Sequence, residues 1–380
     1  MHDLAILGLG PVGATLACLL GARGLRVVVL ERRTEPHTIP RAAHLDGEAL
    51  SILAEAGAPV APFGRPLDGF DLVDRRGRLL LRGRPAETPP DGYPAGVLIH
   101  QPDVERALRD RLGEMPNVAV RLGHEVTEVE DAGDHVEVVG EGPDGPFRLG
   151  AALGVGCDGA ASRVREAMGS RLRGGRFEQP WLVVDVVLRD PEATGPTLPD
   201  RLLQIADPAE PTTYVPFPNP RRRWEFKLAP GTDVEAATHP EAVCQRLAPH
   251  VDPEAVAVER AAVYTFHDLV ATPWRRGHLV LAGDAAHQMP PFLGQGLGAG
   301  LRDAWTLAPL LADVVDGAPA DLLDVYEAVR RPHVEAVIRQ AVRLGRVATL
   351  PRPLASVRDA ALRAAHRVPA LRRRLLDVRG

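Results

Sequence analysis

The chain has 380 residues, 45% hydrophobic and 25% charged, which is ordinary globular composition in a length that suits a core in two parts. Its formal net charge of −5 offers no basic field for nucleic acid. No hydrophobic run approaches membrane-spanning length, and a strand predicted from residue 3 leaves no room for a signal peptide. The three cysteines are scattered and fit neither a disulfide framework nor a zinc site, so we expect a cytoplasmic protein without a metal.

The first residues carry the pattern of a dinucleotide-binding unit. Residues 3–7 predict a short buried strand, and a G-x-G-x-x-G motif follows directly at 8–13. Small residues over 14–20 predict a closely packed helix, and a second strand over 26–30 ends on Glu31. In such a unit the glycines allow a tight turn against a pyrophosphate, and the acid accepts a hydrogen bond from a ribose hydroxyl.

The following segment predicts helices separated by strands. We expect helices over 47–56 and 102–112, the second with proline in its first turn, where proline is tolerated. Residues 70–82 predict two short strands, a loop rich in proline and glycine follows over 84–94, and 118–139 predict a strand meander.

A second marker, Asp158-Gly159, follows a buried strand predicted over 153–157. A turn between a buried strand and a helix is a common place for ligand contacts. From Trp181 to Tyr264 the chain becomes rich in strand patterns, which predicts an inserted domain with strands over 181–188, 201–205, 212–217 and 223–228.

A third marker runs from Gly283 to Asp303 after a strand predicted over 279–282. Four glycines (Gly294, Gly296, Gly298 and Gly300) allow its backbone to press against a flat ligand, and a helical pattern starts at Ala304. The chain remains helical to residue 350. The arginine-rich segment after it is expected to dock on the protein's own fold through Val357, Leu362, Val368 and Leu371.

These markers, in this order, resemble the class A flavoprotein aromatic hydroxylases, which have the p-hydroxybenzoate hydroxylase fold. Residues 177–185, 223–226 and 287–296 resemble most the branch of 3-(3-hydroxyphenyl)propionate hydroxylase, without its C-terminal thioredoxin-like domain. The resemblance implies an α/β fold in which a Rossmann-type FAD-binding domain carries an inserted, mostly β substrate domain. The FAD-binding domain is expected over 1–72, 95–172 and 270–350, the substrate domain over 73–94 and 173–269, and a helical arginine-rich segment over 351–380.

The resemblance also implies roles for individual residues in binding non-covalent FAD. Gly8, Gly10, Pro11, Val12 and Gly13 are expected around the pyrophosphate, Glu31 at the adenosine ribose, and Arg32, Arg41 and Gln101 along the rest of the cofactor. Asp158 is expected to serve both FAD binding and passage of the nicotinamide, and Gly283 and Asp284 to lie near the ribityl chain. Pro291 and Gly294 are expected to face the isoalloxazine, and Gly296 and Leu297 to lie at its pyrimidine edge. The N-terminus of a helix there would stabilise the negative charge of reduced flavin.

The implied activity is monooxygenation of a phenolic or other electron-rich aromatic compound, including a natural product, through a flavin C4a-hydroperoxide. NAD(P)H is expected as a transient co-substrate and O₂ as the oxidant. No dedicated catalytic acid or base is evident, and Tyr214, Pro216, Glu225, Pro291 and Phe292 are the candidates for the substrate pocket.

Three other functions remain open from the sequence: Baeyer–Villiger or polyketide-directed oxygenation, halogenation, and FAD binding without redox chemistry. Halogenation is disfavoured because the Trp-x-Trp-x-Ile-Pro pattern is absent. The expected partner is a small aromatic molecule, without nucleic acid or membrane, and the expected state is a monomer or homodimer.

Overall fold

The computed structural model describes residues 1–36, 40–60, 64–67, 69–83, 93–175, 177–218, 220–368 and 370–371. Most of the loop expected over 84–94 lies outside the described residues, as do residues 372–380 of the arginine-rich segment.

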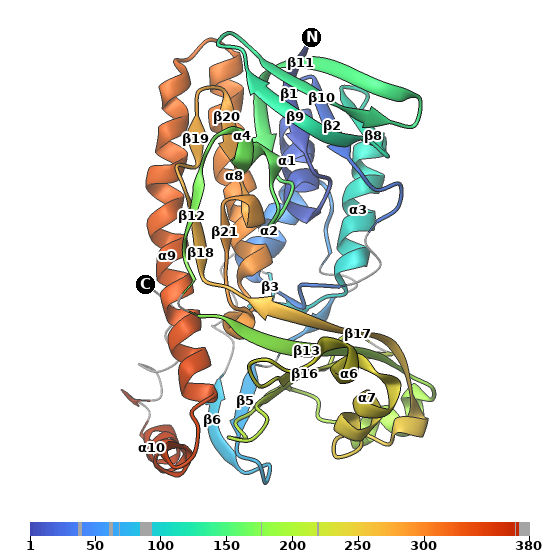
Figure 1. The fold of residues 1–380 in the computed structure, drawn as a ribbon, viewed down its shortest axis with the longest axis vertical. Coiled ribbons are helices and arrows are strands. Elements are labelled where there is room, and N and C mark those ends of the chain that lie inside the picture. Colours follow the sequence, from blue (N-terminus) through green and yellow to red (C-terminus); the bar gives the residue numbers. More distant parts are fainter. Residues whose placement is uncertain are drawn as a thin grey trace.

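An eight-stranded sheet forms the upper part of the molecule in Figure 1. Its centre is parallel, in the order β20 (Leu279–Leu281), β11 (Gly145–Gly156), β1 (His2–Leu7), β2 (Val27–Glu31) and β8 (Val118–Leu122). The short β19 (Arg275–Arg276) pairs with β20, while β10 (Val136–Gly142) and β9 (Glu125–Asp131) extend the sheet antiparallel from β11. Because the central strands are buried on both faces, their sequences are nearly continuous apolar runs.

Helices bury the faces of this sheet. Helix α1 (Pro11–Ala22) packs between α8 (Gly296–Val315) and α3 (Gln101–Gly113), and α2 (Gly47–Glu55) and α9 (Asp324–Ala348) pack on α8. The contact between α1 and α8 is close: a Cβ atom at Gly300 would lie 2.5 Å from Val12 Cγ2. Glycine in the first turns of α8 therefore has a packing role.

A seven-stranded sheet lies below the first one (Figure 1), in the order β17 (Val256–Phe266), β13 (Gln179–Leu188), β16 (Arg221–Lys227), β15 (Thr212–Val215), β14 (Leu202–Ile205), β5 (Phe70–Val73) and β6 (Leu79–Gly83). One face packs Trp224 and Phe226 into a separate core with α6 (Val234–Thr238) and α7 (Pro240–Leu247), as the alternation in the sequence predicts. The opposite face, which we call the inner face, carries Arg223, Glu225 and Lys227 and faces the first sheet's domain.

The two sheets suggest the same division of the chain as the sequence, and we propose it as the domain organisation. Strand β5 begins at Phe70, three residues before the boundary drawn at residue 73, and belongs with β6 to the seven-stranded sheet. The segment 173–269 supplies the other five strands of that sheet.

The remaining elements are small. One three-stranded sheet consists of β3 (His44–Asp46), β7 (Gly96–Leu98) and β4 (Arg65–Pro66), and a second of β12 (Arg171–Gly174), β18 (Leu269–Thr272) and β21 (His287–Gln288). The other α-helices are α4 (Arg163–Ala167), α5 (Pro191–Thr194) and α10 (Leu354–Arg367). The 3-10 helices are η2 (Gly195–Thr197), η3 (Pro253–Ala255), η4 (Gly283–Ala285), η5 (Pro291–Leu293) and η6 (Ala320–Leu323).

Three expectations from the sequence need correction. Strand β8 does not belong to the meander, because it pairs parallel with β2, and only β9, β10 and β11 form the antiparallel run. Helix α8 begins at Gly296 rather than Ala304, since packing on α1 outweighs the low helix propensity of glycine. Strand β17 and helices α6 and α7 were not predicted within the strand-rich region.

Helix α10 docks on the protein's own fold, as predicted. Leu362 is buried in a cluster with Leu72, Leu80, Leu81 and Ala206. The other three residues expected to dock are exposed: Val357 at 68%, Val368 at 44% and Leu371 at 49%. The guanidinium group of Arg358, which is 5% exposed, donates to the carbonyls of Ala348 (2.9 Å) and Ala206 (2.6 Å). Helix α10 thus joins the end of α9 to the seven-stranded sheet.

Replacing Arg358 with methionine should lower stability without changing the fold. Methionine keeps the apolar stem but leaves the two carbonyls without this donor, at a cost of roughly 1–3 kcal/mol. We expect a melting temperature lower by a few degrees in a thermal scan. Arg367→Met, at an exposed position of the same helix, is the matched control, and equal melting temperatures for the two variants would contradict this role of Arg358.

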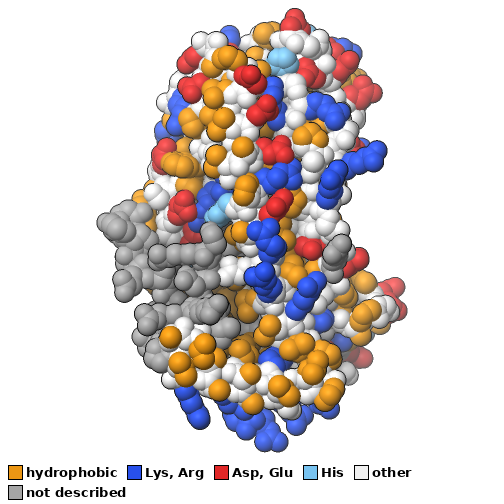
Figure 2. Space-filling view, turned by 90° about the vertical axis from the view of Figure 1, so that its left-hand side faces the viewer, with side chains coloured by type: hydrophobic (Ala, Val, Ile, Leu, Met, Phe, Trp, Pro, Cys, Tyr) orange, Lys and Arg blue, Asp and Glu red, His pale blue; other side chains and the backbone are white. Residues whose placement is uncertain are grey.

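No helix in the described part of the chain is long and apolar enough to cross a membrane. On the face that carries α9 and α10, acidic, basic and hydrophobic side chains are interspersed over the domain of the first sheet (Figure 2).

Candidate functional site

The glycine loop, Glu31 and the two later markers meet at one edge of the first sheet. The glycine loop follows β1, Glu31 ends β2, Asp158 follows β11, and Gly283 follows β20. These four strands are parallel neighbours, so their carboxyl ends lie side by side, which is where ligands bind in open α/β sheets. The tertiary fold therefore brings together residues that are 250 positions and more apart in the sequence.

Glycine is needed at the three positions of the first loop for different structural reasons. Gly8 has φ +99°, and a Cβ atom on it would lie 2.4 Å from the Cys157 carbonyl oxygen. A Cβ atom at Gly13 would lie 2.1 Å from the Gly8 carbonyl oxygen. At Gly10, by contrast, no described atom lies within 4 Å of an added Cβ, so the space above the start of α1 is open. That open space next to backbone N–H groups fits a pyrophosphate.

Glu31 stabilises the glycine loop directly. Its Oε2 accepts a hydrogen bond from the Leu9 backbone N–H at 2.9 Å, and its Oε1 accepts one from Arg33 at 3.0 Å. The neighbouring Arg32 is exposed. The carboxylate is half-buried, and a ribose hydroxyl would join or replace these contacts.

Asp158 has one carboxylate oxygen in use and one without a partner. Oδ2 accepts from the backbone N–H groups of Arg163 (2.7 Å) and Val164 (3.3 Å) at the start of α4. Oδ1 is buried and has no hydrogen-bond partner in the described part of the chain. Burial raises the pKa of this carboxyl. An unsatisfied buried oxygen beside the glycine loop fits a ligand hydroxyl, because leaving it unpaired is costly.

Asp284 follows Gly283 at the carboxyl end of β20. Its side chain is accessible, yet the protein around it desolvates the carboxyl and raises its pKa, against the opposing effects of His287 and Arg41. Gly283 before it has φ +60°, and a Cβ atom there would lie 3.1 Å from Val12 Cγ2. Position 283 therefore needs glycine, and the turn there brings the Asp284 carboxyl close to the loop of residues 8–13.

A buried network behind this turn holds it in place. Asp303 is 0% exposed, and its Oδ2 accepts from the Gly283 N–H (3.1 Å) and lies 2.6 Å from His287 Nε2. Its Oδ1 accepts from Arg330 Nε at 2.9 Å. Burial alone would raise the pKa of Asp303, but His287 and Arg330 outweigh it and lower that pKa. His287 thus orders the loop together with Asp303 and Arg330, and the sequence analysis assigned no role to these last two residues.

The loop that leads into α8 faces both domains. The Phe292 ring packs edge-on against Trp181 and Phe177, with ring centroids 5.7 Å apart in both pairs. Gly294 closes η5 with φ +63°. Helix α8 then starts at Gly296 without a side-chain cap, so the first N–H groups of a 20-residue helix remain available to an anionic group.

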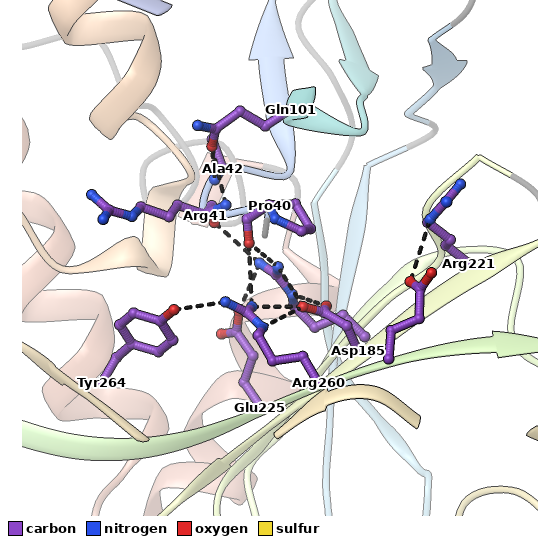
Figure 3. Close-up of polar contacts among 11 residues, drawn as sticks. Pro40, Arg41, Ala42, Gln101, Asp185, Arg221, Glu225, Arg260 and Tyr264 are labelled. Carbon is purple, nitrogen blue, oxygen red and sulfur yellow. Dashed lines mark hydrogen bonds and ion pairs between the residues drawn. The ribbon is translucent and has the colours of Figure 1, made fainter. Parts of the chain in front are cut away.

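The segment Pro40–Ala42 is held from two sides (Figure 3). The Gln101 side-chain oxygen accepts from the N–H groups of Arg41 (3.0 Å) and Ala42 (2.8 Å). From the inner face, Arg223 donates to the carbonyls of Pro40 and Arg41, and Arg260 donates to that of Pro40 at 3.2 Å. The Arg41 side chain itself is exposed and extends away from this cluster.

Asp185 binds both arginines of this cluster, at 2.7 Å from Arg223 Nε and 2.9 Å from Arg260 Nε. Arg223 and Asp185 are 2% and 4% exposed, so the charges are buried but paired. The sequence analysis assigned no role to these three residues. The one available signal was that Arg223 shares a strand face with Glu225.

The candidates for the substrate pocket do not share one face. Glu225 lies on the inner face, 9% exposed, and burial raises its pKa although Arg223 opposes this. Tyr214 lies on the opposite face in the core with Trp224, at a centroid distance of 5.0 Å, and its hydroxyl donates to the Pro199 carbonyl. Burial raises the pKa of Tyr214 to about 12. Pro216 is buried after β15. Tyr214 and Glu225 therefore cannot line the same space.

The fold and the converging markers define a flavoprotein. Residues 1–341 match the family described as FAD binding domain, so the chain belongs to that family, and it is an FAD-dependent aromatic hydroxylase of the p-hydroxybenzoate hydroxylase-like fold. The predictions of fold class, FAD and monooxygenase class are confirmed.

Three known proteins illustrate the similarity. The probable NADH-specific resorcinol 4-hydroxylase of Rhodococcus jostii (strain RHA1) is 38% identical over 370 residues, which are 96% of this chain and 69% of that protein. The 3-(3-hydroxy-phenyl)propionate/3-hydroxycinnamic acid hydroxylase of Mycobacterium sp. (strain JLS) is 38% identical over 99% of this chain and 66% of that protein. The chain thus spans about two thirds of the length of these relatives. The solved structure of p-nitrophenol 4-monooxygenase PnpA from Pseudomonas putida DLL-E4 is similar with a TM-score of 0.89 and 27% identity, covering 99% of this chain and 96% of that chain.

Proposed function

We propose that the protein hydroxylates a phenol, with NAD(P)H as transient reductant and O₂ as oxidant. The observation that carries this proposal is the open space at Gly10 and the unpaired Asp158 oxygen at the edge of the sheet, facing a second sheet across an aromatic loop. Both sequence relatives are named for phenols, resorcinol in one case and a 3-hydroxyphenyl acid in the other. The cytoplasm supplies the nicotinamide, and we place the protein there.

The chain's own residues would hold FAD as follows. The pyrophosphate would lie over Gly8–Gly13, with Glu31, Arg32, Arg41 and Gln101 along the adenosine diphosphate, and Asp158, Gly283 and Asp284 near the ribityl chain. The loop Pro291–Leu297 would face the ring. Bound FAD supplies the redox chemistry, in which NAD(P)H and O₂ yield one oxygen atom for the aromatic ring and one for water.

We place the substrate between the loop that carries Phe292 and the inner face. Side chains there form three cross-strand rows, set by the register of β16, β13 and β17. The first row is Arg223, Asp185 and Arg260; the second is Glu225, Val183 and Ala262; the third is Lys227, Trp181 and Tyr264. Val183 and Ala262 of the second row are smaller than the arginines of the first row and the aromatic rings of the third, which favours this position for an aromatic ring. The protein's task there is to orient the ring and exclude water.

Three measurements test the function. Acid precipitation should release a stoichiometric yellow flavin, and mixing the protein with NADH or NADPH and a panel of phenols should bleach the flavin faster with a true substrate. Product formed under ¹⁸O₂ should carry one labelled hydroxyl. Flavin that is never reduced would favour a non-redox role, and a ring-inserted oxygen would favour Baeyer–Villiger chemistry.

Replacing Pro291 with glycine should uncouple oxygen use from hydroxylation. Pro291 opens η5 and stiffens the loop whose Phe292 contacts Trp181, so glycine adds freedom where the substrate ring must be held. A displacement of about an ångström can cost on the order of 100-fold in a positioned reaction. We expect retained FAD, retained substrate-stimulated NAD(P)H oxidation and more H₂O₂ per turnover.

The matched control is Pro253→Gly, because Pro253 opens η3 in the same way at the opposite end of the substrate domain's longest strand. NAD(P)H, O₂ and H₂O₂ should be measured together. Unchanged coupling in Pro291→Gly would remove this loop from the reaction chamber.

A further inference from the structure

Lys227 is the only lysine in the chain, and its place in the fold is unusual for a charged side chain. It lies on the inner face of β16, because Trp224 and Phe226 point to the opposite core. Its direct neighbour on β13 is Trp181, and Trp181 contacts Phe292 of the loop that leads into α8. Side chains opposite each other in adjacent strands are close neighbours, so Lys227 borders the aromatic contact between the two domains.

The other charges of the inner face are compensated. Arg223 and Arg260 share Asp185, and Arg221 lies 3.4 Å from Glu259 (Figure 3). Lys227 differs: its ammonium group has no hydrogen bond or ion pair with any described residue. Glu225, two positions away on the same face, is not within ion-pair distance of Lys227 and is instead 3.7 Å from Arg223.

The surroundings of Lys227 favour an anion from outside the chain. The side chain is half-buried, and this burial lowers the pKa of the ammonium group. An anion beside it would offset that cost, because an opposite charge favours the charged form. The Glu225 carboxyl faces Arg223 instead, so it does not satisfy Lys227.

We propose that Lys227 binds an anionic substituent, a carboxylate, on the aromatic substrate and so selects acidic phenols over neutral ones. This inference rests on the proposed function, since it takes the space between the inner face and the Phe292 loop as the substrate site. The flexible four-carbon stem lets the ammonium group meet a carboxylate carried on a short arm of a ring bound beside Trp181. Lys227 would then act in specificity and not in the chemistry of oxygen transfer.

The test compares matched ligands that differ only in charge. 3-(3-Hydroxyphenyl)propionate and 3-(3-hydroxyphenyl)propan-1-ol form one pair, and 3-hydroxybenzoate and 3-hydroxybenzyl alcohol a second pair with a shorter arm. Dissociation constants are measured by calorimetry on the FAD-loaded protein without NAD(P)H, so that the readout does not depend on turnover. We expect at least one acid to bind about tenfold or more tightly than its alcohol, the usual size of a charge-assisted hydrogen bond.

Variants at position 227 decide the role of the lysine. Lys227→Met should abolish the preference for the acid and leave the affinity for the alcohol within about twofold, while Lys227→Arg should keep part of the preference. Arg171→Met, which removes one exposed positive charge elsewhere, is the control for net charge and should behave as the wild type. Circular dichroism and the flavin content verify that each variant is folded and loaded.

Three results would overturn the proposal: equal affinity for acid and alcohol in both wild-type pairs, no binding of either acid, or a preference that survives Lys227→Met. Failure of the proposed function looks different. In that case the acids could still bind through Lys227, but no phenol would be hydroxylated when NAD(P)H and O₂ are present.

Discussion

Replacing Gly10 with valine is expected to give a folded protein that does not hold FAD. Gly10 has φ −70° and ψ 177°, an extended conformation that valine adopts without strain, and no described atom lies within 4 Å of an added Cβ. The backbone therefore accepts the side chain. The valine methyl groups would instead fill the space over the start of α1 that we assign to the pyrophosphate.

The measurements are the ratio of flavin to protein absorbance after purification and the melting temperature. Gly10→Val should be colourless and have the melting temperature of the FAD-free wild type, because only the stabilisation by bound cofactor is lost. Gly113→Val, at another glycine with no described atom within 4 Å of an added Cβ, should stay yellow.

Gly13→Val offers a contrast, because its Cβ would lie 2.1 Å from the Gly8 carbonyl oxygen and should destabilise the fold itself. A yellow, stoichiometric Gly10→Val protein would show that the cofactor does not lie over this loop.

Asp303→Asn is expected to cause a large loss of stability. Both carboxylate oxygens accept hydrogen bonds, Oδ1 from Arg330 and Oδ2 from Gly283, and the residue is 0% exposed. Asparagine would replace one carboxylate oxygen with an NH₂ group, which would face another hydrogen-bond donor. It would also remove the negative charge that pairs with the buried Arg330. Breaking a buried pair in this way costs about 3–5 kcal/mol.

We expect a melting temperature lower by roughly 5–15 °C, together with partial loss of FAD because the Gly283 turn is released. Asp313→Asn, at an exposed position of the same helix, is the control. The double variant Asp303→Asn/Arg330→Met should be more stable than Asp303→Asn alone, since it removes the unpaired charge. If it is less stable instead, the charge argument is wrong.

The pH dependence follows from the pKa of Asp303, which pairing lowers below its usual 3.8. A carboxyl whose pKa is lower in the folded than in the unfolded protein stabilises the fold at pH values above its unfolded pKa. This contribution is lost as the pH falls towards and through the lowered pKa of the folded state. The difference in stability between wild type and Asp303→Asn should therefore be constant near neutral pH and shrink only in acid.

The sequence by itself determined the Rossmann unit and the cofactor class. Residues 3–31 carry strand, glycine loop, helix, strand and acid in one continuous stretch, so the order and spacing of these features can be recognised without knowledge of the rest of the fold. Alternation in β16 likewise placed Trp224 and Phe226 in the core, because the period of a strand is a local property.

Tertiary structure decided which residues share a space. Tyr214 and Glu225 were equivalent candidates in the sequence, but the register of β15 against β16 puts Tyr214 opposite Trp224, and so on the face away from Glu225. The hydrogen bond from Arg223 to the Arg41 carbonyl joins residues 182 positions apart, and the network of Asp303 needs four separate elements, α8, η4, β21 and α9. Strand register and the packing of distant segments set these contacts, and a pattern of neighbouring residues contains neither.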